Sequence, residues 1–184
     1  LQSECPRDDG GYGYPELRLR PDVMGSADGL AQAPYIRESR RLKALTTVRQ
    51  QDIAASAQTG PRARLYPDSV GIGWYAIDLH ACVGSPGAGC YTPTLPFQLP
   101  LGALLPVRLR NLLPACKNIG TTHLTNGAYR LHPVEWAVGE AAGTLAAYAC
   151  DAGGMDAQRL AETPHCQRVQ ARLLRRGVPL AWSV

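Results

Sequence analysis

Two residues that can act together chemically stand two positions apart near the middle of the chain, Asp78 and His80. In an extended strand the side chains at i and i+2 point to the same face, so this carboxylate and imidazole are expected to lie side by side. A carboxylate beside an imidazole fixes the orientation of the ring and suits it to act as a general base. The same spacing also fits a hydrogen-bonded pair that serves only the structure.

A second group of polar side chains falls within ten residues, in a segment that reads as a loop. Its members are His123, Asn126, Tyr129, Arg130 and His132. So many hydrogen-bond donors exceed what a connecting loop needs, which indicates ligand binding. Arg130 could hold an anionic group by charge-assisted hydrogen bonds, whereas His132 could simply cap a helix and Tyr129 could simply pack. The alternative for Arg130 is a surface ion pair with Glu135 or Glu140, worth at most about 1 kcal/mol.

The polar segment leads into the clearest helix pattern of the sequence, in which apolar residues recur at i, i+3, i+4 and i+7. They are Val134, Ala137, Val138, Ala141, Ala142, Leu145, Ala146 and Ala149. Pro133 suits the first helical turn, and Gly153 and Gly154 supply the stop. The free N–H groups of the helix start favour an anionic or electron-rich ligand, although a helix simply packed on a sheet fits as well.

Two glycines, Gly139 and Gly143, lie inside this predicted helix. Each costs about 1 kcal/mol relative to alanine, so another backbone or a flat ligand is expected to approach this face closely. We therefore expect Gly143→Leu to prevent folding or ligand retention.

Other patterns predict the elements around this helix. Alternating apolar residues predict strands within 42–48, 70–80 and 97–101. Residues 109–116, apolar on both faces except at the ends, predict a buried strand of a parallel sheet, with Pro114 at its edge or end. Residues 50–57 and 164–176 are predicted helices, whereas 1–33 read as loop with a short strand at 16–20, and 81–96 as an irregular loop. Gly71 and Gly73 share one face of their strand and indicate that something approaches it closely. The fold class is therefore α+β or mixed α/β, with an antiparallel sheet followed by a strand and a long helix.

Composition excludes several classes of protein. The net charge of +4 comes from nineteen Lys and Arg, scattered along the chain, against fifteen Asp and Glu, which suits solubility and anionic ligands rather than nucleic acid. The four histidines and six cysteines show no metal-ligand spacing, so no metal site is expected. Cys82 and Cys90 flank a loop rich in Gly and Pro and could form a disulfide in an oxidising compartment, although free thiols are the alternative.

The sequence does not indicate a compartment. No apolar run is long enough to span a membrane, and no signal peptide opens the chain. Because the first residue is Leu, we expect the N-terminus to be incomplete, and both a cytoplasmic and an exported protein remain open.

Several long segments resemble the C-terminal end of a family of FAD-dependent oxidoreductases related to the glutathione-reductase-like flavoproteins. They are NLLPACKNIGTTH (111–123), NGAYRLHPVEW (126–136), GEAAGTLAA (139–147), PYIRESRR (34–41) and DSVGIGWYAIDLH (68–80). They occur in the order of the family, and the resemblance covers about residues 14–184.

The resemblance implies a domain organisation and a cofactor. Residues 1–105 would form part of a substrate domain, and 106–184 the strand and helix that rejoin an FAD-binding domain. The helix start would face the pyrimidine ring of the flavin. The residues implied to contact FAD are Asn126, Gly127, Tyr129, Leu131, His132, Pro133 and Gly139.

The resemblance also implies a reaction on a small-molecule substrate. With Asp78, His80 acts as a base that removes a proton while hydride leaves to the flavin. Arg130 stabilises negative charge on the reduced flavin or on a bound acid. Arg37 and Arg40 belong to a charge run that would by default be a solvated face, but the resemblance implies that they bind substrate, together with His123.

One departure from the family bears on completeness. The family begins with a strand, a GxGxxG turn and a helix that hold the FAD pyrophosphate, and these 184 residues contain no such motif. The resemblance thus implies the C-terminal part of a larger flavoprotein, which alone binds FAD weakly or not at all and could self-associate into a homo-oligomer. The alternative is a non-catalytic module or a fragment that pairs with a separate FAD-binding chain.

Overall fold

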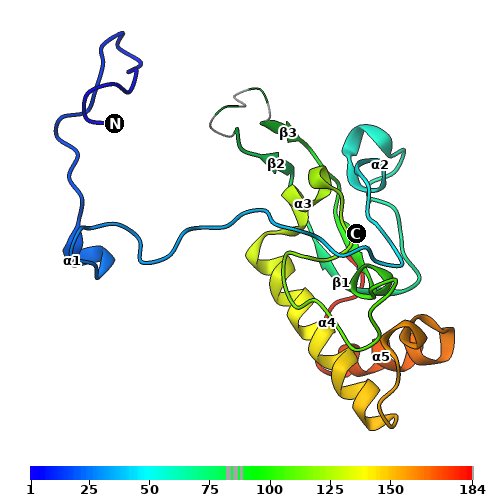
Figure 1. The fold of residues 1–184 in the computed structure, drawn as a ribbon. Helices are drawn as coiled ribbons and strands as arrows, with labels where there is room; N and C mark the ends of the chain where they lie inside the picture. The colour runs from blue at the N-terminus through cyan, green and yellow to red at the C-terminus, as the bar shows by residue number, and fades with distance from the viewer. Residues whose placement is uncertain (82–83, 85–86, 88, 184) are drawn as a thin grey trace. The chain divides into compact units, whose positions relative to one another are not determined.

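The computed structural model describes residues 1–81, 84, 87 and 89–183, and the chain divides into two units, Leu1–Ile36 and Arg37–Val184 (Figure 1). In the first unit the single-turn helix α1 (Pro21–Met24) has no buried residue. Residues 16–20 do not form the predicted strand. The reason is that Leu17 and Leu19 are exposed and find no partner strand to pair with.

The second unit contains two small antiparallel sheets. Strand β1 (Ser69–Gly73) pairs with β4 (Phe97–Pro100), and β2 (Ile77–Leu79) pairs with β3 (Cys90–Thr92). The strands predicted within 70–80 and 97–101 are thus confirmed, although the first is interrupted. Residues 81–96 were predicted to be an irregular loop. This prediction was wrong for residues 90–92, which form β3 because they pair with β2.

The long helix α4 (His132–Asp151) lies directly on β1, and its predicted bounds are confirmed. Gly73 explains how the two approach so closely. A Cβ on Gly73 would lie 2.5 Å from Cε2 of Phe97 and 2.7 Å from Cγ2 of Val134. Only a residue without a side chain leaves room for Val134 of the helix, which confirms the close approach expected at this strand.

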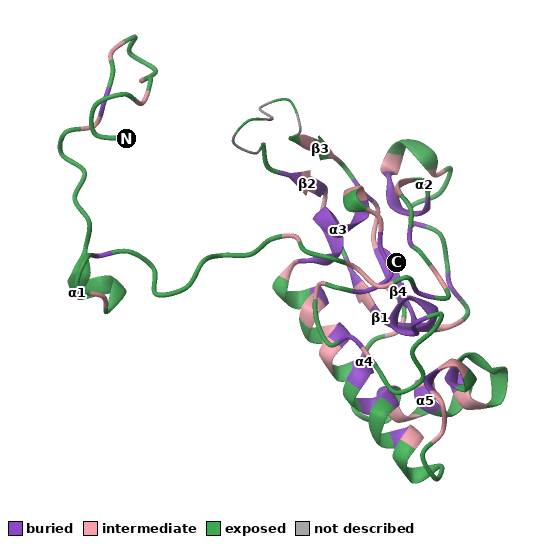
Figure 2. Ribbon diagram, viewed as in Figure 1, coloured by how far each residue is buried: buried purple, intermediate pink, exposed green. Residues whose placement is uncertain are grey.

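One hydrophobic core joins the elements of this unit (Figure 2). Helix α5 (Thr163–Arg175) confirms the helix predicted over 164–176; it packs on α4 and β1 and buries Cys166, Val169 and Leu173. Burial raises the pKa of the Cys166 thiol to about 11. The predicted helix at 50–57 is present as α2 (Gln50–Ile53) followed by a 3-10 turn (Ala55–Ala57).

The structure corrects the strand prediction for 109–116. This segment forms no strand, and Leu109 and Leu112 are 43% and 37% exposed. Pro106 and Pro114 bracket it and lack the N–H groups that a central strand must donate. Residues 42–48 do alternate in burial but form only isolated bridges at Ala44 and Val48.

The polar segment before α4 is also not a loop. It forms α3 (His123–Tyr129), which packs against β2. Thr122 caps this helix: its hydroxyl accepts from Thr125 N at 3.2 Å, and Thr125 Oγ1 accepts from Thr122 N at 2.9 Å. This capping box uses Thr in place of the usual Glu or Gln, which is why the pattern was missed.

With helices packed on small antiparallel sheets, the predicted α+β class is confirmed. Among the residues that the structure describes, none of the helices has the length and apolar character needed to cross a bilayer.

Candidate functional site

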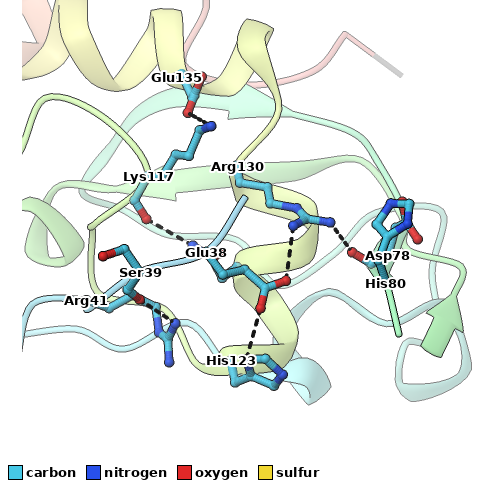
Figure 3. A network of polar contacts seen from close by, with 10 residues as sticks. Glu38, Ser39, Arg41, Asp78, His80, Lys117, His123, Arg130 and Glu135 are labelled. Atoms are coloured by element: carbon cyan, nitrogen blue, oxygen red, sulfur yellow. Dashed lines mark hydrogen bonds and ion pairs between the residues drawn. The ribbon is translucent and has the colours of Figure 1, made fainter. Parts of the chain in front are cut away.

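A buried arginine organises the polar side chains that the sequence singled out (Figure 3). Arg130 ends α3, and its side chain is only 6% exposed. Its Nη1 donates to Oε1 of Glu38 at 3.0 Å, and its Nη2 donates to the backbone oxygen of Asp78 at 2.6 Å. Arg130 therefore ties three segments together, at Glu38, at β2 and at the end of α3.

Two histidines extend this cluster, each beside a carboxylate. Nδ1 of His123 lies 3.5 Å from Oε2 of Glu38, and Nε2 of His80 lies 3.3 Å from Oδ2 of Asp78. The two imidazole side chains are 58% and 55% exposed, so both can be reached from solvent. The two histidines thus form one polar network with Glu38, Asp78 and Arg130.

The structure replaces the expected partners of Arg130. Glu135 pairs with Nζ of Lys117 at 3.5 Å and accepts a hydrogen bond from Sγ of Cys116 at 3.2 Å. Burial and this bond to Glu135 raise the pKa of the Cys116 thiol. The partner of Arg130 is therefore Glu38 and not Glu135. Glu38 lies 92 positions away in the sequence, so the local spacing around Arg130 could not have indicated this ion pair.

Three further residues predicted for the cofactor face the protein interior on α3. Nδ2 of Asn126 donates to the backbone oxygen of Lys117 at 2.9 Å, while its Oδ1 is buried without a partner among the described residues. The hydroxyl of Tyr129 donates to the backbone oxygen of Gln98 at 2.7 Å, and burial raises the pKa of this phenol well above its usual value. Gly127 lies directly against the backbone of Asp78. These contacts fix α3 on the sheet.

An open cleft of about 500 Å³ lies at the start of α4, and we call it the aromatic cleft. All three tryptophans of the chain line it, together with Tyr75 and the predicted residues Leu131 and Pro133. Its other lining residues are Ile72, Gly73, Val134, Ala137, Glu140, Val178 and Pro179. Sequence reasoning missed the tryptophans, although the concentration of this rare residue at two of the family-like segments was visible.

Hydrogen bonds hold two of these rings in place. Nε1 of Trp74 donates to the backbone oxygen of Thr94 at 3.2 Å, and Nε1 of Trp182 donates to that of Gly73 at 3.2 Å. The two ring centroids are 6.3 Å apart, with an angle of 78° between the planes. Because both indole N–H groups are engaged by the protein, a ligand meets the rings through their π surfaces.

The start of α4 offers backbone donors beside this cleft. No side chain caps the helix, whose N-cap residue is Leu131, so the predicted cap by His132 is absent. His132 and Val134 occupy the first turn, where N–H groups have no intrahelical partner, and Pro133 has no N–H at all. This arrangement suits an electron-rich edge of a flat ligand.

The remaining predicted residues lie outside the cleft lining. Arg37 and Arg40 are exposed on either side of Glu38 in the sequence. A Cβ on Gly139 would lie 3.7 Å from the backbone oxygen of Ala115, an ordinary contact. The predicted pairing of Cys82 with Cys90 concerns a residue outside the described part, since Cys82 is not described.

Another backbone or a flat ligand was expected to lie close to Gly143 on α4, and the structure shows that this expectation is wrong. A Cβ there would meet nothing within 4 Å. We now expect Gly143→Ala to raise the free energy of unfolding by about 0.5–1 kcal/mol, because alanine is the better helix former and has room. Chemical denaturation of both proteins measures this, and a loss of stability would show that the face is covered in solution.

An apolar, aromatic cleft with a few polar groups at its edge is the form that small-molecule sites usually take. Residues 1–173 match the family model described as FAD dependent oxidoreductase, and the chain belongs to this family. It is a flavoprotein oxidoreductase, and its cofactor is FAD. No curated protein and no solved structure matches the chain.

The residues of the aromatic cleft fit the isoalloxazine ring of this cofactor. The π surfaces of Trp74, Trp136 and Trp182 suit the flat faces of the ring, and the donors at the start of α4 suit its electron-rich edge. For the pyrophosphate, these 184 residues contain no GxGxxG sequence of the kind that holds it in dinucleotide-binding folds.

Proposed function

We propose that this chain forms the flavin-ring and substrate side of an FAD-dependent oxidoreductase that oxidises a small molecule by hydride transfer to the flavin. The observation that carries the proposal is the aromatic cleft at the uncapped start of α4, in a chain matched by the family model over residues 1–173. When bound, FAD supplies the hydride acceptor. The chain supplies binding, orientation and proton transfer.

Each part of the site has a separate role in this proposal. The tryptophans, Leu131 and Pro133 hold the ring and exclude water. The positive end of α4 favours the negative charge that the reduced flavin gains. His80, oriented by Asp78, accepts the substrate proton, which its 3.3 Å contact and half-exposed ring allow.

Arg130 and Glu38 position this machinery in our proposal. The guanidinium of Arg130 holds the β2 backbone at Asp78 and, through Glu38, the imidazole of His123. His123 then faces substrate together with the exposed Arg37 and Arg40, whose charges suit a carboxylate or another anionic group. This replaces the simpler idea that Arg130 itself reaches the ligand.

We further propose that the pyrophosphate of FAD is held by a GxGxxG unit outside these 184 residues, as in the glutathione-reductase-like flavoproteins. Residues up to about 105 then belong to a substrate domain and the rest to an FAD-binding domain. The hydrophobic core described above would be continuous across that boundary. The second candidate, a non-catalytic module that needs a separate FAD-binding chain, follows from the same missing motif.

Flavin binding tests this proposal. We expect the chain to bind riboflavin and FAD with affinities within about threefold of each other, because only the ring is recognised. Trp136→Leu should weaken both equally, since Trp136 is 75% exposed and lines the cleft. Quenching of flavin fluorescence measures these affinities.

The matched control for this test is Tyr91→Leu, at a 72% exposed aromatic residue on β3 outside the cleft lining. It should leave flavin binding unchanged. FAD binding more than tenfold tighter than riboflavin would show that this chain holds the pyrophosphate. Binding of neither flavin would favour the module that needs a partner chain.

A further inference from the structure

We propose that the side of the aromatic cleft formed by Glu140, Trp136 and Trp182 is a subsite for an alkylammonium group of the substrate. All three side chains line the same cleft, from α4 and from the C-terminal segment. The identification of this ligand as the substrate rests on the proposed function. The binding of a cation there does not.

The charge of the cleft comes from a single residue. Of the described residues that line it, Glu140 is the only charged one. It is exposed, and within the described ranges no hydrogen bond or ion pair engages its carboxylate. An unneutralised carboxylate at an otherwise apolar, aromatic wall attracts a cation and repels an anion.

Helix geometry places this carboxylate beside an aromatic ring. Trp136 and Glu140 are four residues apart on α4, so their side chains project from the same side of the helix. The cation of an alkylammonium group is held by the face of a tryptophan ring and by a nearby carboxylate, which is how aromatic cages recognise such ligands. A neutral ligand of the same shape gains nothing from Glu140.

The same helix separates this subsite from the proposed flavin end. Glu140 lies seven positions after Pro133, which corresponds to about 10 Å along the helix axis. The two ends of the cleft therefore differ in electrostatic character. The backbone donors at the start of α4 favour electron-rich groups, and the carboxylate of Glu140 favours a cation. The two ends of the cleft therefore offer different chemistry to a flavin ring and to a cationic group.

The C-terminal segment, residues 178–182, forms the opposite wall of the cleft and is attached to the sheet of β1 and β4 by hydrogen bonds. The backbone oxygen of Leu180 accepts from Oγ of Ser69 at 2.7 Å and from Nε2 of Gln98 at 2.8 Å. Trp182, two residues further on, is bonded to the backbone of β1.

A pair of probes that differ only in charge tests the subsite. Choline and 3,3-dimethyl-1-butanol have nearly the same shape, with a quaternary nitrogen in one and a carbon in the other. We expect choline to quench the tryptophan fluorescence of the full chain and to bind about tenfold more tightly than the neutral alcohol.

Two variants assign the effect to named residues. Glu140→Gln should weaken choline binding about fivefold to tenfold and leave the alcohol unchanged. Glu16→Gln, which makes the same charge change at an exposed residue of the first unit, should alter neither. Trp182→Leu should also weaken choline binding. Denaturant unfolding of this variant is the control that shows whether the chain is still folded.

Equal affinities for the two probes, an unchanged choline affinity in Glu140→Gln, or no saturable choline binding would each overturn the subsite. The outcome is separable from the proposed function. Riboflavin binding without choline binding would remove only the subsite. Choline binding without riboflavin binding would keep the cation site and count against the flavin proposal.

Discussion

Arg130→Met is expected to lower the free energy of unfolding by about 3 kcal/mol, a value typical of breaking a buried ion pair by removing one partner. The substitution keeps an unbranched side chain of similar length but leaves Glu38, whose side chain is only 27% exposed, without its 3.0 Å partner. The backbone oxygen of Asp78 also loses its donor. The alternative of a surface ion pair worth at most about 1 kcal/mol is contradicted by the burial of Arg130, whose side chain is 6% exposed.

The double variant Arg130→Met/Glu38→Gln separates the cause. Removing the charge that Arg130 no longer neutralises should recover part of the lost stability, so the two effects should not add. Urea denaturation followed by circular dichroism measures each variant. A urea denaturation curve of Arg130→Met that is identical to that of the wild type would mean that the buried ion pair is not formed in solution.

Gly127→Ala is expected to lower the free energy of unfolding by about 2 kcal/mol or more. A Cβ at this position would lie 2.9 Å from both the backbone nitrogen and the backbone oxygen of Asp78. Backbone atoms cannot move aside as a flexible side chain does, so α3 must shift away from β2, at an overpacking cost of about 1–3 kcal/mol or more. Alanine would otherwise favour a helix by about 1 kcal/mol, which offsets only part of this cost.

Gly143→Ala is the matched control, because it makes the same change inside a helix where nothing lies within 4 Å. The two variants should shift the denaturation midpoint in opposite directions. His80 gives a second measurement: if α3 moves, the contact between Asp78 and His80 changes, and the imidazole resonances of His80 should shift in Gly127→Ala but not in Gly143→Ala. Stabilisation of both variants would refute the packing of α3 on β2.

The helices and strands with strong local periodicity could be predicted from the sequence. Helix α4 follows its apolar stripe, α5 its basic amphipathic pattern, and β1 and β4 their alternation. Each pattern joins residues that are neighbours within one element, so the signal is contained in a short window. The strand at 109–116 failed because apolar composition outweighed Pro106 and Pro114 in that prediction.

The candidate site could be predicted only where its residues are close in sequence. The adjacency of Asp78 and His80 follows from their spacing on one strand. The family-like segments pointed to the start of α4, where Leu131 and Pro133 do line the cleft.

Tertiary structure alone decided the partners that come from distant segments. Glu38 reaches Arg130 across 92 positions, and Trp182 reaches Gly73 across 109. Such contacts depend on how elements pack around a shared core, which no local pattern records. The sequence therefore determined which elements form and where the chemistry-bearing residues are concentrated. Packing decided that Arg130 is braced inside the protein and that three separated tryptophans share one cleft.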